Sequence, residues 1–165
     1  NAGIRVDVAF DASDADWRSA WRRDLQVNLM APAELCRRAV QTFRTQGRGG
    51  KIVNIASRAA QRGFTDNALS YGASKAGLIN LTKSLARSFG GEGIISVSIA
   101  PGFVDTPLAQ DFLKRHPGSS AVSEIPVGIM VAPEEIADLV GYCVNNKNIS
   151  INGATIDING GSYIR

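Results

Sequence analysis

The stretch Ile52-Val53-Asn54-Ile55-Ala56 decides the fold, because a short run of β-branched residues such as this is typical of a buried strand. A helical pattern follows it over residues 70–89, and a second β-branched run, Ile94 to Ile99, stops at Pro101-Gly102. The order strand, helix, strand predicts parallel strands joined by a crossover helix.

On the amino-terminal side, Ser13-Asp14-Ala15-Asp16 is typical of a helix start, with carboxylates in the first turn. Apolar residues at three- and four-residue spacing predict a second helix over residues 29–46, which Gly47 ends. Pro32 predicts a bend or break near Asn28.

On the carboxyl-terminal side, we expect a long irregular stretch from Asp105 to Val131. Pro133 then begins a helix, and Ala154 to Ile158 forms the last strand. The whole pattern predicts an α/β fold, a Rossmann-like doubly wound parallel sheet, with residues 1–165 in a single domain.

The composition is that of an ordinary soluble globular protein, with 44% hydrophobic and 20% charged residues in 165. The net charge of +3 is scattered, which argues against nucleic-acid binding, and no apolar run is long enough to predict a membrane span. Cys36 and Cys143 lie in apolar helical patterns and are expected to be free thiols, so the cytoplasm is the expected location. We expect no metal site.

Tyr71 and Lys75 are four residues apart at the start of the helix predicted over residues 70–89, so their side chains share one face. A neighbouring ammonium lowers the pKa of a phenol, which would make this pair a plausible proton donor and acceptor. The alternative is a surface tyrosine beside a solvated lysine.

Ser57 follows the first strand and Pro101 to Thr106 follow the second, so both segments should lie at the carboxyl edge of the sheet, where ligands bind in such folds. A serine here could hydrogen-bond a substrate carbonyl, or it could simply cap a helix or a turn. The Pro101-Gly102 pair could equally be a strand terminator.

Taken together, these motifs resemble the short-chain dehydrogenase/reductase family over nearly the whole chain. The segments that carry the resemblance are Asn1-Ala2-Gly3, Val27-Asn28-Leu29, Ile55-Ala56-Ser57, Tyr71 with Lys75, Pro101-Gly102 with Thr106, Pro133 to Ala137, and Ile158 to Gly161. The resemblance implies a catalytic tetrad of Asn28, Ser57, Tyr71 and Lys75, in which Asn28 places a water that relays protons to Lys75.

The resemblance further implies NADP or NAD as cofactor, with hydride transfer between the nicotinamide and a carbonyl or alcohol carbon. The residues that would meet the cofactor are Asn1, Ala2, Gly3, Tyr71, Lys75, Pro101, Gly102, Val104 and Thr106. The match looks closest to 3-oxoacyl-acyl-carrier-protein reductases, which implies a small-molecule or acyl-carrier-linked carbonyl substrate and a homodimer or homotetramer.

The family's glycine-rich phosphate loop does not occur in this sequence, so we expect residues upstream of Asn1 to complete the nucleotide site. The chain would then be the catalytic, carboxyl-terminal part of an oxidoreductase, inactive by itself. The main alternative is a non-catalytic fragment that acts as an oligomerisation or binding module. A serine hydrolase is disfavoured, because the Gly-x-Ser-x-Gly motif is missing.

Overall fold

A computed structural model describes residues 2–145 and 147–165; only the backbone of Leu108 is described. Its α-helices and strands are, in chain order, α1 (Asp14–Leu25), α2 (Ala31–Gln46), β1 (Gly50–Ile55), α3 (Ala59–Arg62), α4 (Leu69–Phe89), β2 (Ile94–Pro101), α5 (Pro107–Arg115), α6 (Pro133–Asn145) and β3 (Thr155–Ile158). A π-helical segment, Gln26–Met30, joins α1 to α2, and short 3-10 turns lie at Asp66–Ala68 and Gly90–Glu92.

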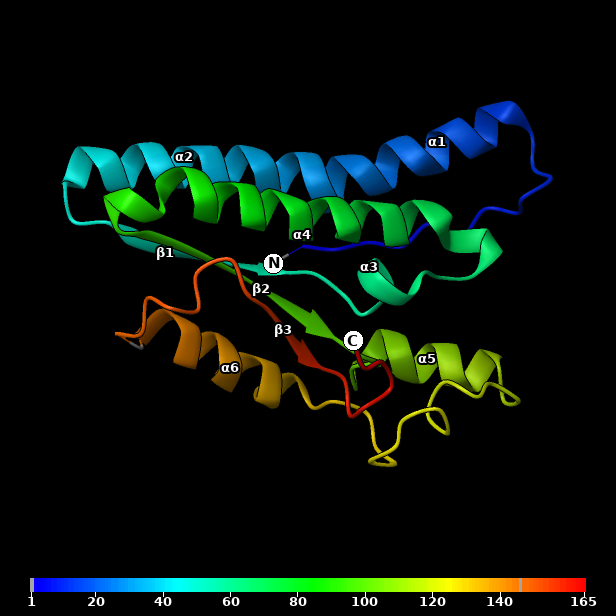
Figure 1. The fold of residues 1–165 in the computed structure, drawn as a ribbon. Coiled ribbons are helices and arrows are strands. Elements are labelled where there is room, and N and C mark those ends of the chain that lie inside the picture. The colour runs from blue at the N-terminus through cyan, green and yellow to red at the C-terminus, as the bar shows by residue number, and fades with distance from the viewer. Residues whose placement is uncertain (1, 146) are drawn as a thin grey trace.

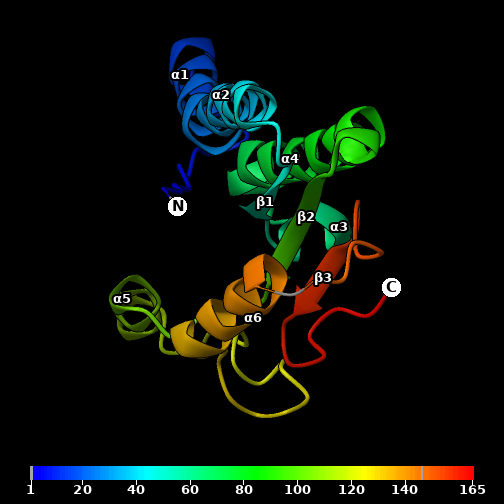
Figure 2. The same cartoon turned by 90° about the vertical axis from the view of Figure 1, so that its left-hand side faces the viewer.

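The described strands form one parallel sheet in the order β1-β2-β3, with Gly50 beside Ile94 at one end and Ile55 beside Ile99 at the other. Helices α2 and α4 cover one face and α6 covers the other (Figures 1 and 2). The expected α/β fold with a doubly wound parallel sheet is therefore confirmed.

Two apolar clusters hold the layers together, one on each face of the sheet. There are two because alternate residues of a strand face opposite sides of a sheet. Ile52 and Ile94 pack with Cys36, Val40 and Leu85 beneath α2 and α4. On the opposite face, Ile95 and Val97 pack with Cys143, supported by the partly buried Val53, Leu139, Ile151 and Ile156. Both cysteines are free and buried, as expected.

The sequence predicts a bend or break near Asn28, and the structure has a π turn there without a break. Pro32 has no N–H to donate to the carbonyl of Asn28, so the regular helical ladder is interrupted there. The helix widens by one residue instead, and the N–H of Ala31 donates to the carbonyl of Gln26. Figure 1 shows α1 and α2 following one another as a nearly continuous rod along α4.

The expectation of an irregular stretch from Asp105 to Val131 is wrong in its first part, where α5 forms. Thr106 caps this helix through a hydrogen bond from the N–H of Ala109 to its hydroxyl, and Pro107 occupies the first turn. These are the same start signals that predicted α6 at Pro133. Beyond α5, the chain to residue 130 consists of turns, as expected.

No helix in the described part of the chain is long and apolar enough to cross a membrane.

Candidate active site

The carboxyl ends of β1 and β2 and the start of α4 surround one cavity of about 420 Å³. Ser57 reaches it from the end of β1, Tyr71 and Lys75 from α4, and Gly102 from the turn after β2. The remaining lining residues are Gly3, Ile4, Arg5, Asp7, Arg58, Phe64, Phe103, Val104, Thr106, Ala109, Phe112 and Arg115. Parallel strands thus bring the predicted residues to one edge of the sheet, as the general rule for such folds requires.

The Tyr71 phenol lies against the Ser57 hydroxyl and is largely desolvated. Burial raises the pKa of Tyr71 above its ordinary value, while the Ser57 hydrogen bond and the positive charge of Arg5 lower it and the carboxylate of Asp24 raises it. The sequence predicts that Lys75 lowers the pKa of this phenol, whereas the net shift of the Tyr71 pKa in this chain is upward. At neutral pH, Tyr71 is a protonated phenol, the form that can donate a proton.

Lys75 is buried, with 6% of its surface exposed, and it is not the solvated lysine of the alternative interpretation. Its Nζ donates a hydrogen bond of 2.9 Å to the carbonyl oxygen of Ile55, at the end of β1. It lies 6.0 Å from the centre of the Tyr71 ring. Burial lowers the pKa of Lys75, because a desolvated ammonium is penalised.

Ser57 makes a local hydrogen bond and also lines the cavity. Its Oγ accepts a hydrogen bond of 3.1 Å from the N–H of Ala59, two residues further on, in a serine turn that precedes the single-turn helix α3. The same hydroxyl faces the Tyr71 phenol in the cavity. This hydrogen bond orients the side chain, so that the hydroxyl stays at the cavity wall.

Asn28 lies in the π turn, 1% exposed, and its side chain fastens other segments together. Its Oδ1 accepts from the N–H of Ile4 at 3.0 Å, and its Nδ2 donates to the carbonyl of Ile4 at 2.8 Å and to Oγ of Ser74 at 3.1 Å. Its side chain is thus occupied by protein partners, and it lines a neighbouring cavity of about 330 Å³ between α2 and β1 that Lys75 also lines.

Asp24 is a second buried anchor for the extended segment 2–9, which forms one wall of the active-site cavity. Its carboxylate accepts hydrogen bonds from the hydroxyl of Ser70 at 2.6 Å and from the N–H of Val6 at 3.1 Å. Asp24 is fully buried. Together with Asn28, it connects α1, the wall segment and the start of α4.

Substituting Asp24→Ala is expected to lower the free energy of unfolding by about 2–3 kcal/mol, because two donors lose a charged acceptor inside the protein. Chemical denaturation monitored by circular dichroism measures this change. The control is Asp14→Ala, which removes an ion pair with Arg18 whose aspartate side chain is 92% exposed. That variant should change stability by less than about 1 kcal/mol; equal losses in both variants would contradict the anchoring role.

The turn after β2 is held close to the end of the sheet. A Cβ atom added to Gly102 would lie 2.8 Å from Asn159, so only glycine allows this approach. Val104 bridges to Val131, and Thr106 lines the cavity while its hydroxyl caps α5. Gly102, Val104 and Thr106 thus line the cavity together, whereas Pro101 lies at the end of the strand and its carbonyl accepts from the N–H of Arg58.

The residues predicted from the opening segment separate into two places. Gly3 lines the active-site cavity, and a Cβ atom added to it would lie 3.7 Å from Nζ of Lys75. Ala2 lines the neighbouring cavity between α2 and β1. Asn1 lies outside the described residues.

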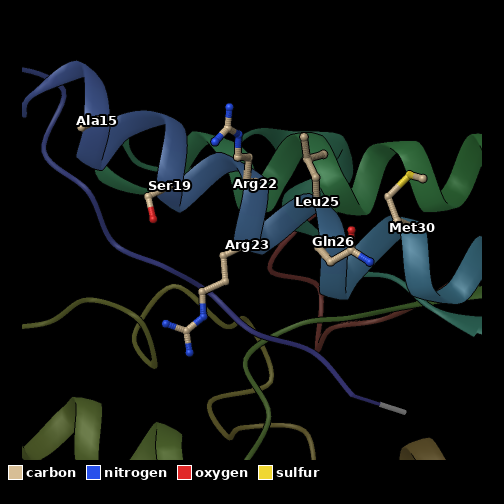
Figure 3. Close-up of a pocket in the computed structure, with 7 residues that line it drawn as sticks. All are labelled: Ala15, Ser19, Arg22, Arg23, Leu25, Gln26 and Met30. Atoms are coloured by element: carbon tan, nitrogen blue, oxygen red, sulfur yellow. The ribbon is translucent and has the colours of Figure 1, made fainter.

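A further cavity lies along α1 and the π-helical segment, away from these groups, and is shown in Figure 3. Its lining residues are Ala15, Ser19, Arg22, Arg23, Leu25, Gln26 and Met30. Arg22 and Arg23 project to different sides of the helix in this view. A groove on one helix that brings together no proton donor, base and oxyanion donor is not a candidate for catalysis.

Sequence reasoning missed several residues of the active-site cavity. Arg5, Phe64, Phe103 and Phe112 come from loops and from the unpredicted helix α5, so no periodic pattern marked them. Arg58 carried a usable signal, because it directly follows Ser57 at the end of a predicted strand.

This sequence and this fold are those of a known family. A family model described as enoyl-(acyl carrier protein) reductase matches residues 1–163, and the chain belongs to the short-chain dehydrogenase/reductase family.

Individual relatives agree with this assignment. The chain is 33% identical, over 99% of its length and 61% of the relative's, to (3R)-3-hydroxyacyl-CoA dehydrogenase of Rattus norvegicus. It is 36% identical to 3-oxoacyl-[acyl-carrier-protein] reductase of Rickettsia felis, over 98% of the chain and 64% of the relative. The chain thus spans less than two thirds of the length of these relatives.

Solved structures show the same architecture. A crystal structure from Agrobacterium tumefaciens, provisionally described as a 2-deoxy-d-gluconate 3-dehydrogenase with bound NADP, superimposes with a TM-score of 0.88. The sequence identity is 29%, and the match covers 98% of this chain and 65% of the other.

Proposed function

We propose that this chain is the catalytic part of an NAD(P)-dependent oxidoreductase that transfers hydride between a nicotinamide and a carbonyl or alcohol carbon. The observation that carries the proposal is the convergence of Ser57, Tyr71 and Lys75 on one cavity at the carboxyl edge of a parallel sheet. Residues 1–165 would act as one domain, or as the carboxyl-terminal part of one.

The donor set of the cavity suits the nicotinamide half of the cofactor. The backbone of the Gly102–Val104 turn and the hydroxyl of Thr106 would hold the carboxamide or a phosphate, and Lys75 would hold the ribose hydroxyls. Gly3 presents no side chain to this space, which leaves room for a flat ring and its ribose. When bound, the cofactor would supply or accept the hydride.

Tyr71 would act as the general acid in reduction. Its protonated phenol would donate a proton to the carbonyl oxygen as negative charge develops there, and would take a proton back in oxidation. Ser57, whose hydroxyl is held by the N–H of Ala59, would hydrogen-bond the same oxygen and stabilise that charge. The buried ammonium of Lys75 would favour the phenolate that forms after the transfer.

The hydrogen bonds of the Asn28 side chain to Ile4 and Ser74 support a positioning role. Through them Asn28 would fix the extended segment 2–9 and α4 relative to each other. A water that relays protons to Lys75 would then be held by the backbone of the π turn, where Pro32 leaves the carbonyl of Asn28 without its regular helical donor.

The substrate would be a small or acyl-carrier-linked carbonyl compound, with 3-oxoacyl reduction supported by the names of relatives in this family. A homodimer or homotetramer formed through α2 and α4, in the cytoplasm, completes the proposal. The exposed Leu35, which is 67% accessible on α2, supports such an interface.

Titration of the full-length protein with NADPH and NADH tests the proposal. We expect saturable quenching of the fluorescence of the protein and, after addition of a ketone, oxidation of the cofactor followed by its absorbance. The chain of 165 residues is the comparison, since it lacks a glycine-rich loop and should bind more weakly. A full-length protein that binds neither nucleotide would favour the alternative, a non-catalytic oligomerisation or binding module.

A further inference from the structure

Arg58 is a buried cation beside the reacting groups that the proposed mechanism does not use. It follows Ser57 directly, lines the same cavity as Ser57 and Tyr71, and is only 8% exposed. Its Nη1 is enclosed and has no hydrogen-bond partner among the described residues. A buried guanidinium normally has each of its donors satisfied, and Nη1, which has almost no accessible surface, would meet an acceptor in the cavity after a small shift of the Arg58 side chain.

The protein does not supply that acceptor from the neighbouring segments. The carboxylate whose charge acts on Arg58 is that of Glu124, and it is engaged by Arg62 at 3.5 Å and by the hydroxyl of Ser120 at 2.7 Å. Burial and the positive charge of Arg62 both lower the pKa of Arg58, and only Glu124 opposes them. The site thus has an excess of positive charge that an anion would relieve.

The other charges of the cavity agree with this excess. Arg5 is paired with Asp7 at 3.0 Å, and Arg115 with Asp111 at 3.2 Å, so the positive charge of each is already balanced by a carboxylate. Asp7 is the single carboxylate among the described lining residues, and Lys75 adds a further cation.

The cavity continues outward past a rim at Arg5. The guanidinium of Arg5 lies over the rings of Phe64 and Phe112, at 5.7 Å and 5.6 Å from their centres, and forms an apolar and cationic rim. A second hollow, lined by Arg5, Phe64 and Phe112 together with residues 115–119, continues outward from this rim. Arg58 and Tyr71 both lie in the wall of the inner cavity, so a ligand that contacts them would extend past this rim.

We propose that Arg58 is a specificity-determining residue that binds an anionic group, a carboxylate or a phosphate, of the carbonyl substrate. The inference rests on the proposed oxidoreductase function and names its substrate class: oxo compounds with a negative charge near the reacting carbonyl. An arginine presents two parallel donors to such a group, which a lysine cannot do.

The test uses pairs of one anionic and one neutral probe: acetoacetate against its methyl ester, and dihydroxyacetone phosphate against dihydroxyacetone. In the full-length wild-type protein, we expect a higher kcat/KM for the anionic member of at least one pair, and which pair responds distinguishes a carboxylate from a phosphate. In Arg58→Met, that preference should fall about 10- to 100-fold, mainly through KM. Arg58→Lys should recover part of it.

The control is Arg22→Met, a change on α1 outside the active-site cavity that should leave the preference unchanged. Calorimetric binding of the same anions and of NADPH provides a readout that does not need turnover. Loss of anion binding in Arg58→Met in a protein that transfers no hydride would uphold the Arg58 assignment and defeat the oxidoreductase proposal.

Three results would overturn the Arg58 assignment. The first is an equal fall of kcat/KM for charged and neutral probes with a lower melting temperature, which indicates a structural arginine. The second is a loss of NADPH affinity alone, which assigns the anion to the cofactor. The third is a wild-type protein that neither binds nor prefers the anions.

Discussion

Replacing Tyr71 with phenylalanine is expected to lower the turnover number of the full-length protein roughly 10²- to 10⁴-fold, the usual contribution of a general acid. The substitution removes one oxygen atom from a half-buried ring that packs against Phe64 at 5.7 Å between centres, so the fold should be preserved. Affinity for NADPH should change little, because the phenol acts on the substrate oxygen. Steady-state kinetics with NADPH and a reducible ketone measure the effect.

The matched control is Tyr142→Phe, which removes the same atom from a tyrosine on α6 that is 50% exposed. Its kinetics should equal those of the wild type. If Tyr71→Phe also retained a rate within a few fold of the wild type, another group would have to supply the proton.

Replacing Lys75 with methionine is expected to lower kcat/KM about 10- to 100-fold, because the phenolate loses a buried cation and the ribose loses a charged donor. NADPH affinity should fall in parallel, which separates this variant from Tyr71→Phe. Fluorescence titration and steady-state kinetics measure the two effects. Lys83→Met, an exposed lysine eight residues further along α4, should change neither.

The pH profile provides a second measure of the same residue. Burial lowers the pKa of Lys75, so its ammonium is charged below that lowered pKa and is lost as the pH rises through it. Activity that depends on the charge should therefore decline with rising pH, and the decline should set in at a lower pH than the ordinary lysine pKa would give. Lys75→Arg should move this decline to higher pH. An unchanged alkaline limb in Lys75→Arg would mean that the charge of Lys75 is not used.

Much of the fold could be predicted because its signals are local. The β-branched runs at β1 and β2, the glycines that end α2 and α4, and Pro133 at the start of α6 each act within one turn of the chain. Helix α5 was missed although Thr106 and Pro107 carry the same kind of start signal, because the surrounding turns made the whole region look irregular.

The candidate site was predictable to the extent that topology brings strand ends together. Ser57 and Tyr71 could be assigned to one edge from the order of elements, before any coordinates. The direction of the Tyr71 pKa shift could not be predicted, because it depends on how completely the protein desolvates the phenol. Burial outweighs the neighbouring charges. Asp24 and Asn28 were equally hidden as anchors, since their partners Val6 and Ile4 are contacted through backbone groups.

Transfer of deuterium from NADPH labelled on the nicotinamide ring to a ketone tests the central claim most directly. With the full-length wild-type protein, the label should appear on the carbinol carbon of the product. With Tyr71→Phe, which should still bind NADPH, transfer in a single turnover should be slower by about 10²-fold or more. Transfer at the wild-type rate in that variant, or no transfer by the wild-type protein with its cofactor bound, would contradict the role assigned to this cavity.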